Sequence, residues 1–500
     1  MVVKWLGGSK PDHPMADEKG ARDVLASLPK GDAAQAIVDI RHWLESVTAT
    51  EGFKPERRAE LFLLLDEAAQ VHQRKLARDY LVSPRATKFQ EVRLRQALSG
   101  LWADLATTYA TLLEQIAADS GTAGRLKAQL PLLCVRAVRA LAAQLKWQYM
   151  HYEPGEAAVW QALGKVYRFA EAKKVHREAV PLYPGVPMSS STEREFMKTL
   201  MLAASSPDCL MPLDIELAEW IIAHFTTSFL ISEVHQPQVT YNWIDLSGGA
   251  PPKRLTDAPP ASPGLRFFAP GVANEQLDTL IGVLEKGAVP ADLNLGGTYE
   301  AARVIAVLRH LKLYWAATPP VRKFDRYGVK HRLTVVNGLD AIFARVLGSS
   351  AQAGAETWVT ENISSGGVGA VVSGAQGDWL GIGKLVGLSV EGGSGTWSVG
   401  VVRRCHRLPQ QQQVSVGVRT FAKSAYAVTL GGGVEQFALV VADGPALGEE
   451  VLICMRDGTF DKRVSPTMAH EGHKYLLIPV EVSETGADFE VARYRVLQQS

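Results

Sequence analysis

Between residues 33 and 232, apolar positions recur with the period of an α-helix. In residues 33–47, for example, one face carries Ala36, Ile37, Ile40, Trp43 and Leu44. Further long segments keep this period up to residue 232, with short breaks such as the Tyr-Glu-Pro-Gly of residues 152–155. The pattern predicts an α-helical bundle or solenoid of roughly eight helices.

One segment of this region carries the pattern Trp160-x-x-Leu163-Gly164-x-x-Tyr167. The same letters open the first helix of a tetratricopeptide repeat, whose unit is about 34 residues long. The remaining positions of such a unit do not follow, and the chain holds no second copy. The alternative interpretation is a single packed helix with its aromatic residues on the buried face.

The composition changes on either side of this helical region. Residues 1–32 are polar and contain Gly, Pro and Lys, which predicts a flexible leader. Residues 233–263 are rich in Pro and Gly and are expected to form a linker. A shorter helical segment is predicted over residues 264–318, which ends before the prolines at positions 319 and 320.

Beyond residue 319 the pattern is that of short strands with Gly and Asn at the breaks. Residues 319–424 contain several such runs, among them residues 331–348, and they predict a small antiparallel β-barrel. Residues 425–500 are also β-rich and are expected to form either a second small barrel or an extension of the first. The predicted fold class is therefore α+β and multidomain, with an N-terminal helical domain and C-terminal barrels.

Composition narrows the classes of function. The 500 residues carry a formal net charge of +1, so nothing global favours binding to a nucleic acid polymer or to a membrane surface. The four cysteines lie far apart, which is typical of a reduced, cytoplasmic protein without a zinc or redox pair. No apolar run approaches the length of about 18 residues that a membrane-spanning helix needs, so membrane insertion is not expected.

The stretch Asn362-Ile-Ser364-Ser-Gly-Gly367-Val-Gly369 combines an amide, hydroxyls and glycines directly before a β-branched run. Glycines permit close approach to the backbone, the amide can both donate and accept, and free turn N–H groups suit an anion. Alone, the pattern also fits an ordinary turn. A near-copy, Asp245-x-Ser247 followed by glycines, leads into prolines rather than a strand and is interpreted as a loop.

A pair of arginines precedes the predicted barrel. Arg322 and Arg326 are four residues apart, in an extended or turning segment that follows two prolines. The planar guanidinium group suits phosphate oxygens and the O6/N7 edge of guanine. The alternative is a solvated basic linker.

Taken together, the Arg-x-x-x-Arg segment and the Asn-x-Ser-x-x-Gly motif on an early barrel strand resemble the PilZ family of bacterial cyclic di-GMP receptors. The resemblance covers about residues 320–422. It implies that Arg322 and Arg326 bind phosphates and guanine. It further implies that Asn362 meets a guanine edge, that Ser364 bonds a base or phosphate, and that Gly367 leaves room for the ligand and keeps the turn.

This sequence departs from the family pattern in two places that bear on affinity. Asn362 stands where the family often has Asp, so a charged guanine acceptor is replaced by an amide. Val321 precedes Arg322, where many members carry another basic residue, which favours one bound ligand over a stacked pair. The gap between Arg326 and Asn362 is expected to include a hairpin insertion. The resemblance tolerates this insertion, because a longer loop changes the free energy of folding only slightly.

The resemblance implies a non-enzymatic intracellular receptor that binds cyclic di-GMP without a cofactor. It would relay occupancy to the helical domain and to a protein partner. The alternative is an adaptor whose barrel does not bind nucleotide and whose helical domain docks partners. No nucleophile–base pair predicts catalysis, and His470 and His473 lack the further ligands of a metal site.

Overall fold

The computed structural model describes most of the chain, and the residues that it describes form two compact units. The first unit comprises the residues up to Pro320, except for two short segments, Tyr152–Pro154 and Asp208–Met211. The second unit comprises these two segments and Val321–Ser500. The described residues are 11–82, 88–186, 188–287, 289–290, 293–318, 320–321, 324–348, 354–373, 379–393, 395–408, 412–431, 435–443, 449–470 and 472–499.

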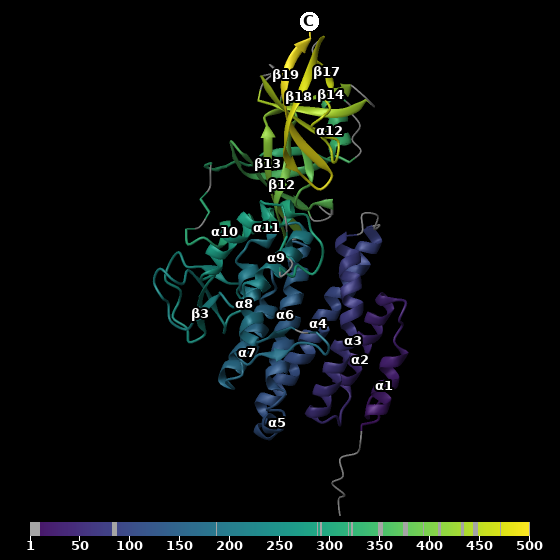
Figure 1. Ribbon diagram of the computed structural model, residues 1–500, viewed down its shortest axis with the longest axis vertical. Coiled ribbons are helices and arrows are strands. Elements are labelled where there is room, and N and C mark those ends of the chain that lie inside the picture. Colours follow the sequence, from purple (N-terminus) through teal and green to yellow (C-terminus); the bar gives the residue numbers. More distant parts are fainter. Residues whose placement is uncertain are drawn as a thin grey trace, which may run out of the picture. The chain divides into compact units, whose positions relative to one another are not determined.

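The first unit is built mainly of helices, several of which run side by side (Figure 1). The described part of residues 33–232 contains eight α-helices, which agrees with the number that the apolar period predicted. The α-helices of the unit are α1 (Glu18–Ser27), α2 (Ala33–Ala49), α3 (Pro55–Val82), α4 (Lys88–Ala118), α5 (Ser120–Arg125), α6 (Leu130–Met150), α7 (Ala157–Ala172), α8 (Thr192–Ala203), α9 (Pro212–His224), α10 (Ala273–Leu284) and α11 (Ala301–Trp315).

Within the flexible leader expected over residues 1–32, the described part, residues 11–32, contains a capped helix, and residues 1–10 lie outside the described residues. Asp17 caps α1 by accepting a hydrogen bond from the Gly20 N–H at 2.9 Å, and the Met15 side chain is fully buried. A side-chain oxygen at the N-cap satisfies an N–H group that the helix leaves unpaired. The polar composition of this segment concealed both the helix and its apolar anchor.

The linker predicted over residues 233–263 holds two strands, and the helical segment predicted over residues 264–318 holds α10 and α11 but begins with a strand. A four-stranded antiparallel sheet runs in the order β3-β6-β4-β5, and three of its strands come from these two ranges. Prolines lie between these strands rather than within them, which is why composition alone indicated a loop. The strands are β3 (Leu230–Ser232), β4 (Asn242–Asp245), β5 (Lys253–Arg254) and β6 (Leu265–Ala269), and a separate pair joins β1 (Val180–Pro181) to β2 (Ser189–Ser190).

The Trp160 to Tyr167 pattern lies on α7, where its aromatic and leucine side chains are buried. Gly164 is required because a Cβ at this position would meet the Leu246 carbonyl oxygen at 2.2 Å. The glycine thus lets the helix approach the chain that follows β4. These contacts fit a single helix packed within its own unit.

A network of buried charges ties α6, α8 and α9 together. Lys198 donates to Glu195 at 2.8 Å and contacts Glu219 at 3.2 Å, while Lys146 donates to Glu219 at 2.6 Å. Arg139 donates to Glu195 at 3.2 Å. Burial alone would raise the pKa of Glu195, but the charges of Lys198 and Arg139 lower it to about 2.

This depressed pKa predicts acid-sensitive stability. Because the folded-state pKa of Glu195 lies below its ordinary value, its contribution is complete above the ordinary pKa and is lost as pH falls toward about 2. The difference in unfolding free energy between the wild type and Glu195→Gln should therefore shrink as pH falls from 6 to about 3. Urea unfolding followed by circular dichroism measures it, and a difference independent of pH would contradict the prediction.

The second unit contains two six-stranded antiparallel barrels. The first closes through the cyclic pairing β8-β9-β10-β13-β12-β11, and β7 pairs with β9 as an additional strand. Its strands are β7 (Tyr327–Gly328), β8 (Arg332–Asn337), β9 (Glu356–Ser364), β10 (Gly367–Ser373), β11 (Leu385–Val390), β12 (Ser398–Leu408) and β13 (Gln413–Ala422). Its interior is lined by valines and leucines around Trp358, and the Tyr152 ring is part of the same cluster.

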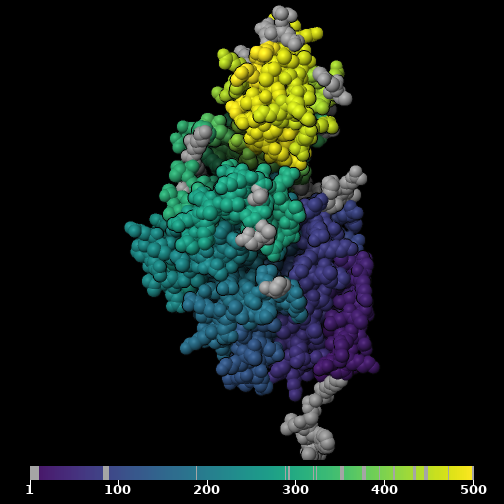
Figure 2. Space-filling view, viewed as in Figure 1, coloured from purple at the N-terminus to yellow at the C-terminus, as the bar shows by residue number. Residues whose placement is uncertain are grey.

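The β-rich segment 425–500 forms a second closed barrel rather than an extension of the first. The strand order is β14-β15-β16-β19-β18-β17, closed by the pairing of β14 with β17. The strands are β14 (Ser424–Gly431), β15 (Gln436–Ala442), β16 (Glu450–Arg456), β17 (Thr467–His470), β18 (His473–Thr485) and β19 (Phe489–Gln499). The C-terminal strands, in yellow, cover much of the visible face of this barrel (Figure 2).

The run 331–348, which was interpreted as β-rich, is only half strand. After β8 the chain forms the helix α12 (Leu339–Val346), whose Leu339, Ile342, Phe343 and Val346 lie in one apolar cluster. That cluster also contains Val399 and Val401 of β12 and residues of the second barrel. The two barrels of this unit therefore share an apolar core outside the first barrel.

Candidate functional site

A row of small residues crosses the outer face of the first barrel. The row consists of Gly328 on β7, Asn362 on β9, Gly369 on β10 and Gly417 on β13, each the cross-strand partner of the next. Gly417 is in turn the partner of Arg404 on β12. Valines that alternate with these positions fill the barrel interior, so the glycines face outward and form a flat platform.

The side-chain amide of Asn362 lies over this platform. A Cβ on Gly369 would meet the Asn362 Nδ2 and Oδ1 atoms at 2.8 Å, so the amide covers the glycine. Among the residues that the structure describes, no hydrogen bond engages this amide. The near-copy differs, because the Asp245 carboxylate accepts from the Ser247 N–H at 2.9 Å and from the Ser262 hydroxyl at 3.1 Å. The acceptor of the near-copy is thus already occupied.

Packing within the barrel requires a glycine at the position of Gly367. A Cβ there would meet the Val418 carbonyl oxygen at 2.1 Å, so β10 could not approach β13 with any other residue. The Ser364 hydroxyl donates to the Gly367 carbonyl at 3.3 Å and fixes the hairpin between β9 and β10. In this structure both residues shape the turn that carries Asn362.

Residues 324–328, which include Arg326, lie against this hairpin. Tyr327 and Gly328 pair with Ile363 and Asn362, and a Cβ on Gly366 would meet the Phe324 ring at 2.7 Å. Arg326 directly precedes this pairing, is exposed, and makes no ion pair within the described part of the chain. Arg322 lies outside the described residues. The structure therefore brings Arg326 to the end of β9 that carries Asn362 and Ser364.

The outer face also carries arginines that the sequence motifs did not select. Arg419 is the cross-strand partner of Gly367, and Arg404 follows Gly417 in the platform row and donates to Asp208 of the same unit at 2.6 Å. The available signal was the alternation of small or charged residues with valine in "GVGAVV" and "VSVGVRTF". The Asn-x-Ser-x-x-Gly motif ends at Gly367, so it does not include Gly369 or Gly417.

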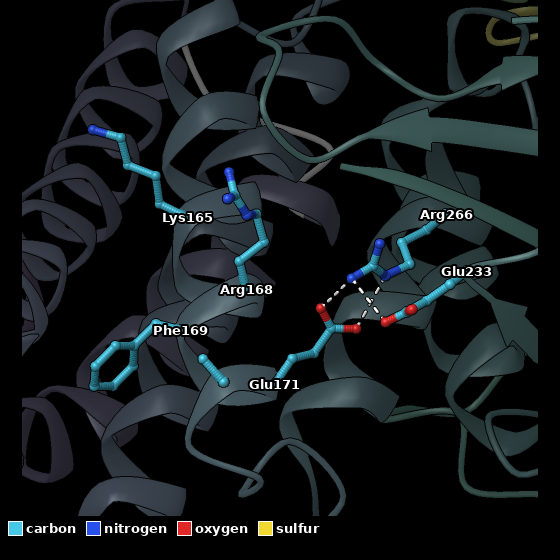
Figure 3. A pocket seen from close by; sticks show the side chains of 7 residues that line it. Lys165, Arg168, Phe169, Glu171, Glu233 and Arg266 are labelled. Atoms are coloured by element: carbon cyan, nitrogen blue, oxygen red, sulfur yellow. Dashed lines mark hydrogen bonds and ion pairs between the residues drawn. The ribbon is translucent and has the colours of Figure 1, made fainter. Parts of the chain in front are cut away.

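The first unit also contains a hollow, which is lined mainly by residues of α7 (Figure 3). Its floor is closed by Arg266, which donates to both oxygens of Glu171 and contacts Glu233 at 3.3 Å. Lys165 and Arg168 line its rim and are exposed. Arg266 of this hollow is thus already paired with carboxylates.

Residues 19–237 match the family model described as the cyclic-di-GMP receptor FimW, N-terminal domain. The match covers less than half of the chain and falls on the helical unit. This part of the chain is therefore similar to the N-terminal domain of a cyclic-di-GMP receptor. No curated protein and no solved structure matches the chain.

Two further observations bear on the class of site. The helices of the described residues include none with the length and apolarity to cross a membrane. Burial raises the pKa of the Cys134 and Cys405 thiols to about 12. These two thiols remain protonated near neutral pH and are poor nucleophiles.

Proposed function

We propose that this protein is a receptor for cyclic di-GMP and that the nucleotide binds on the outer face of the first barrel, as in the PilZ family. The observation that carries the proposal is the pairing of β7 with β9, which brings Arg326 beside Asn362 and Ser364. The match of residues 19–237 to a cyclic-di-GMP receptor domain supports the same ligand from a different part of the chain.

The platform suits a flat, dianionic ligand. Gly328 and Gly417 leave room for a purine ring or a ribose–phosphate backbone to lie against the strands, while the Asn362 amide lies over Gly369. In this proposal Arg326 and Arg322 bind phosphate oxygens, and the Asn362 amide donates to and accepts from a guanine edge. Ser364 contributes a hydroxyl, and Gly367 keeps the hairpin in place.

Occupancy would pass to the helical unit through the chain itself. The arginine segment follows α11 after a short connection, so ordering this segment over a nucleotide restrains the end of that helix. The helical unit would then present its surface to a protein partner. The protein acts in this scheme as a non-enzymatic intracellular receptor.

A second candidate function is an adaptor with a barrel that does not bind nucleotide. The observation in its favour is Asn362, because an amide lacks the charge and the second carboxylate oxygen that would strengthen a guanine contact. In that case the helical unit alone would carry the interaction with a partner. Titration with the nucleotide separates the two functions.

Isothermal calorimetry of the full-length protein with cyclic di-GMP tests the proposal. We expect saturable binding below about 100 μM, which corresponds to a binding free energy of at least about −5.5 kcal/mol. Cyclic di-AMP is the matched control, because it keeps both phosphates but changes the base edge that meets Asn362, and we expect it to bind more weakly. Absence of heat with cyclic di-GMP up to that concentration would favour the adaptor.

A further inference from the structure

Three charged side chains meet beside the platform, and one of them comes from the second barrel. Arg403 on β12 and Arg419 on β13 both contact the carboxylate of Glu484 on β18. Each arginine uses an Nη2 atom, and each contacts a different oxygen of Glu484. Both barrels belong to the same compact unit, so this contact lies within it.

Irregularities in both strands bring these side chains together. In β12 the pairing with β13 passes from Val402 to Arg404, which leaves Arg403 as the extra residue of a β-bulge. In β18 the pairing with β19 passes from Val482 to Glu484 in the same way. A bulge redirects the side chains beside it and is frequent next to functional sites.

The cluster carries more positive than negative charge. One carboxylate, 10% exposed, faces two guanidinium groups that are 48% and 46% exposed. Burial and the neighbouring charge of Arg403 lower the pKa of Arg419. A second anion at this position would relieve the repulsion between the arginines, and their exposed halves leave room for one to approach.

Arg419 also borders the site where the nucleotide is placed. It is the cross-strand partner of Gly367, and Gly367 is in turn the partner of Ser364. These three residues form a second row next to the glycine platform. An anion bound over Ser364 would therefore lie near Arg419, an arginine that contacts Glu484 in this structure.

We propose that Glu484 is a built-in competitor that occupies Arg403 and Arg419 until a phosphate of the nucleotide displaces it. The inference rests on the proposed function and extends it to regulation. When the phosphate takes the arginines, the Glu484 carboxylate loses its partners and β18 of the second barrel is released at that point. Ligand binding would then be reported by the second barrel as well as by the arginine segment.

Calorimetry with cyclic di-GMP on four full-length proteins tests this inference. We expect Glu484→Gln to bind cyclic di-GMP at least about five-fold more tightly than the wild type does, because the competing negative charge has been removed. Arg419→Ala should bind at least about five-fold more weakly. Glu481→Gln is the matched control, because Glu481 lies on the same strand and pairs instead with Arg493. It should leave affinity unchanged.

The outcomes separate this inference from the proposed function. If the wild type binds cyclic di-GMP and Glu484→Gln binds it equally or more weakly, the proposed role of Glu484 as a competitor is wrong. The proposed receptor function would not be affected by that result. Binding by Glu484→Gln alone would support the competitor in its strongest form. Absence of binding by every variant would overturn both proposals.

Hydrogen exchange provides a second measurement that a purely structural Glu484 would not change. In the wild type, cyclic di-GMP should increase amide exchange near Glu484 in β18, because the carboxylate is released there. The Glu484→Gln protein should lack this ligand-dependent increase. If circular dichroism shows that Glu484→Gln does not fold, hydrogen exchange of the wild type with and without cyclic di-GMP tests the inference. Slower amide exchange in β18 with the ligand would overturn it.

Discussion

Replacing Arg326 with alanine should weaken binding of cyclic di-GMP by about 10-fold to 100-fold. A hydrogen bond to a charged group is worth about 1.5–3 kcal/mol, and 1.4 kcal/mol corresponds to a factor of ten in affinity. Because Arg326 is exposed and makes no ion pair in the described part of the chain, its removal leaves no internal charge unpaired. Affinity should fall without a change in thermal stability. Calorimetry and thermal unfolding together measure both effects.

A matched control separates loss of the site from loss of charge. Arg463 is also an exposed arginine of the second unit, and it pairs locally with Asp461 at 2.9 Å. Arg463→Ala changes the net charge by the same amount and should leave affinity unaltered. We expect Arg322→Ala to behave like Arg326→Ala. Retention of full affinity in both Arg322→Ala and Arg326→Ala would show that the nucleotide binds elsewhere.

Replacing Arg136 with methionine should destabilise the helical unit by about 3–5 kcal/mol. Arg136 and Asp66 are 1% and 2% exposed, and their side chains meet at 2.7 Å. Removal of the guanidinium group leaves a buried carboxylate with neutral donors only, and an uncompensated buried charge is costly. Urea unfolding followed by circular dichroism measures the change. The remaining donors to the carboxylate are Gln70, Tyr109 and Tyr183.

Two variants make this stability test specific. Adding Asp66→Asn to Arg136→Met removes the unpaired charge and should restore part of the lost stability. Arg125→Met removes an ion pair with Glu56 at a surface position where the arginine is 58% exposed, and it should destabilise the protein far less than Arg136→Met does. A loss below about 1 kcal/mol for Arg136→Met would contradict the assigned role of the buried pair.

The sequence predicted residues of the candidate site but not their arrangement. Asn362 and Ser364 were selected because an amide, a hydroxyl and glycines precede a strand, and the structure places them on the hairpin between β9 and β10. The platform itself depends on cross-strand register, which joins Gly328, Gly369 and Gly417 from three different strands. Register is set by long-range pairing, so no local pattern could show that these glycines are neighbours.

The periodicity of apolar residues by itself determined the helical region, the change to strands after residue 319 and the multidomain α+β class, because burial imposes a local period on each element. Tertiary structure decided where elements pair. It closed residues 425–500 into a second barrel, turned residues 339–346 into a helix within the core shared by the barrels, and set Glu484 against Arg403 and Arg419. These last residues lie far apart in sequence, and only the packing of one barrel against the other brings their charges together.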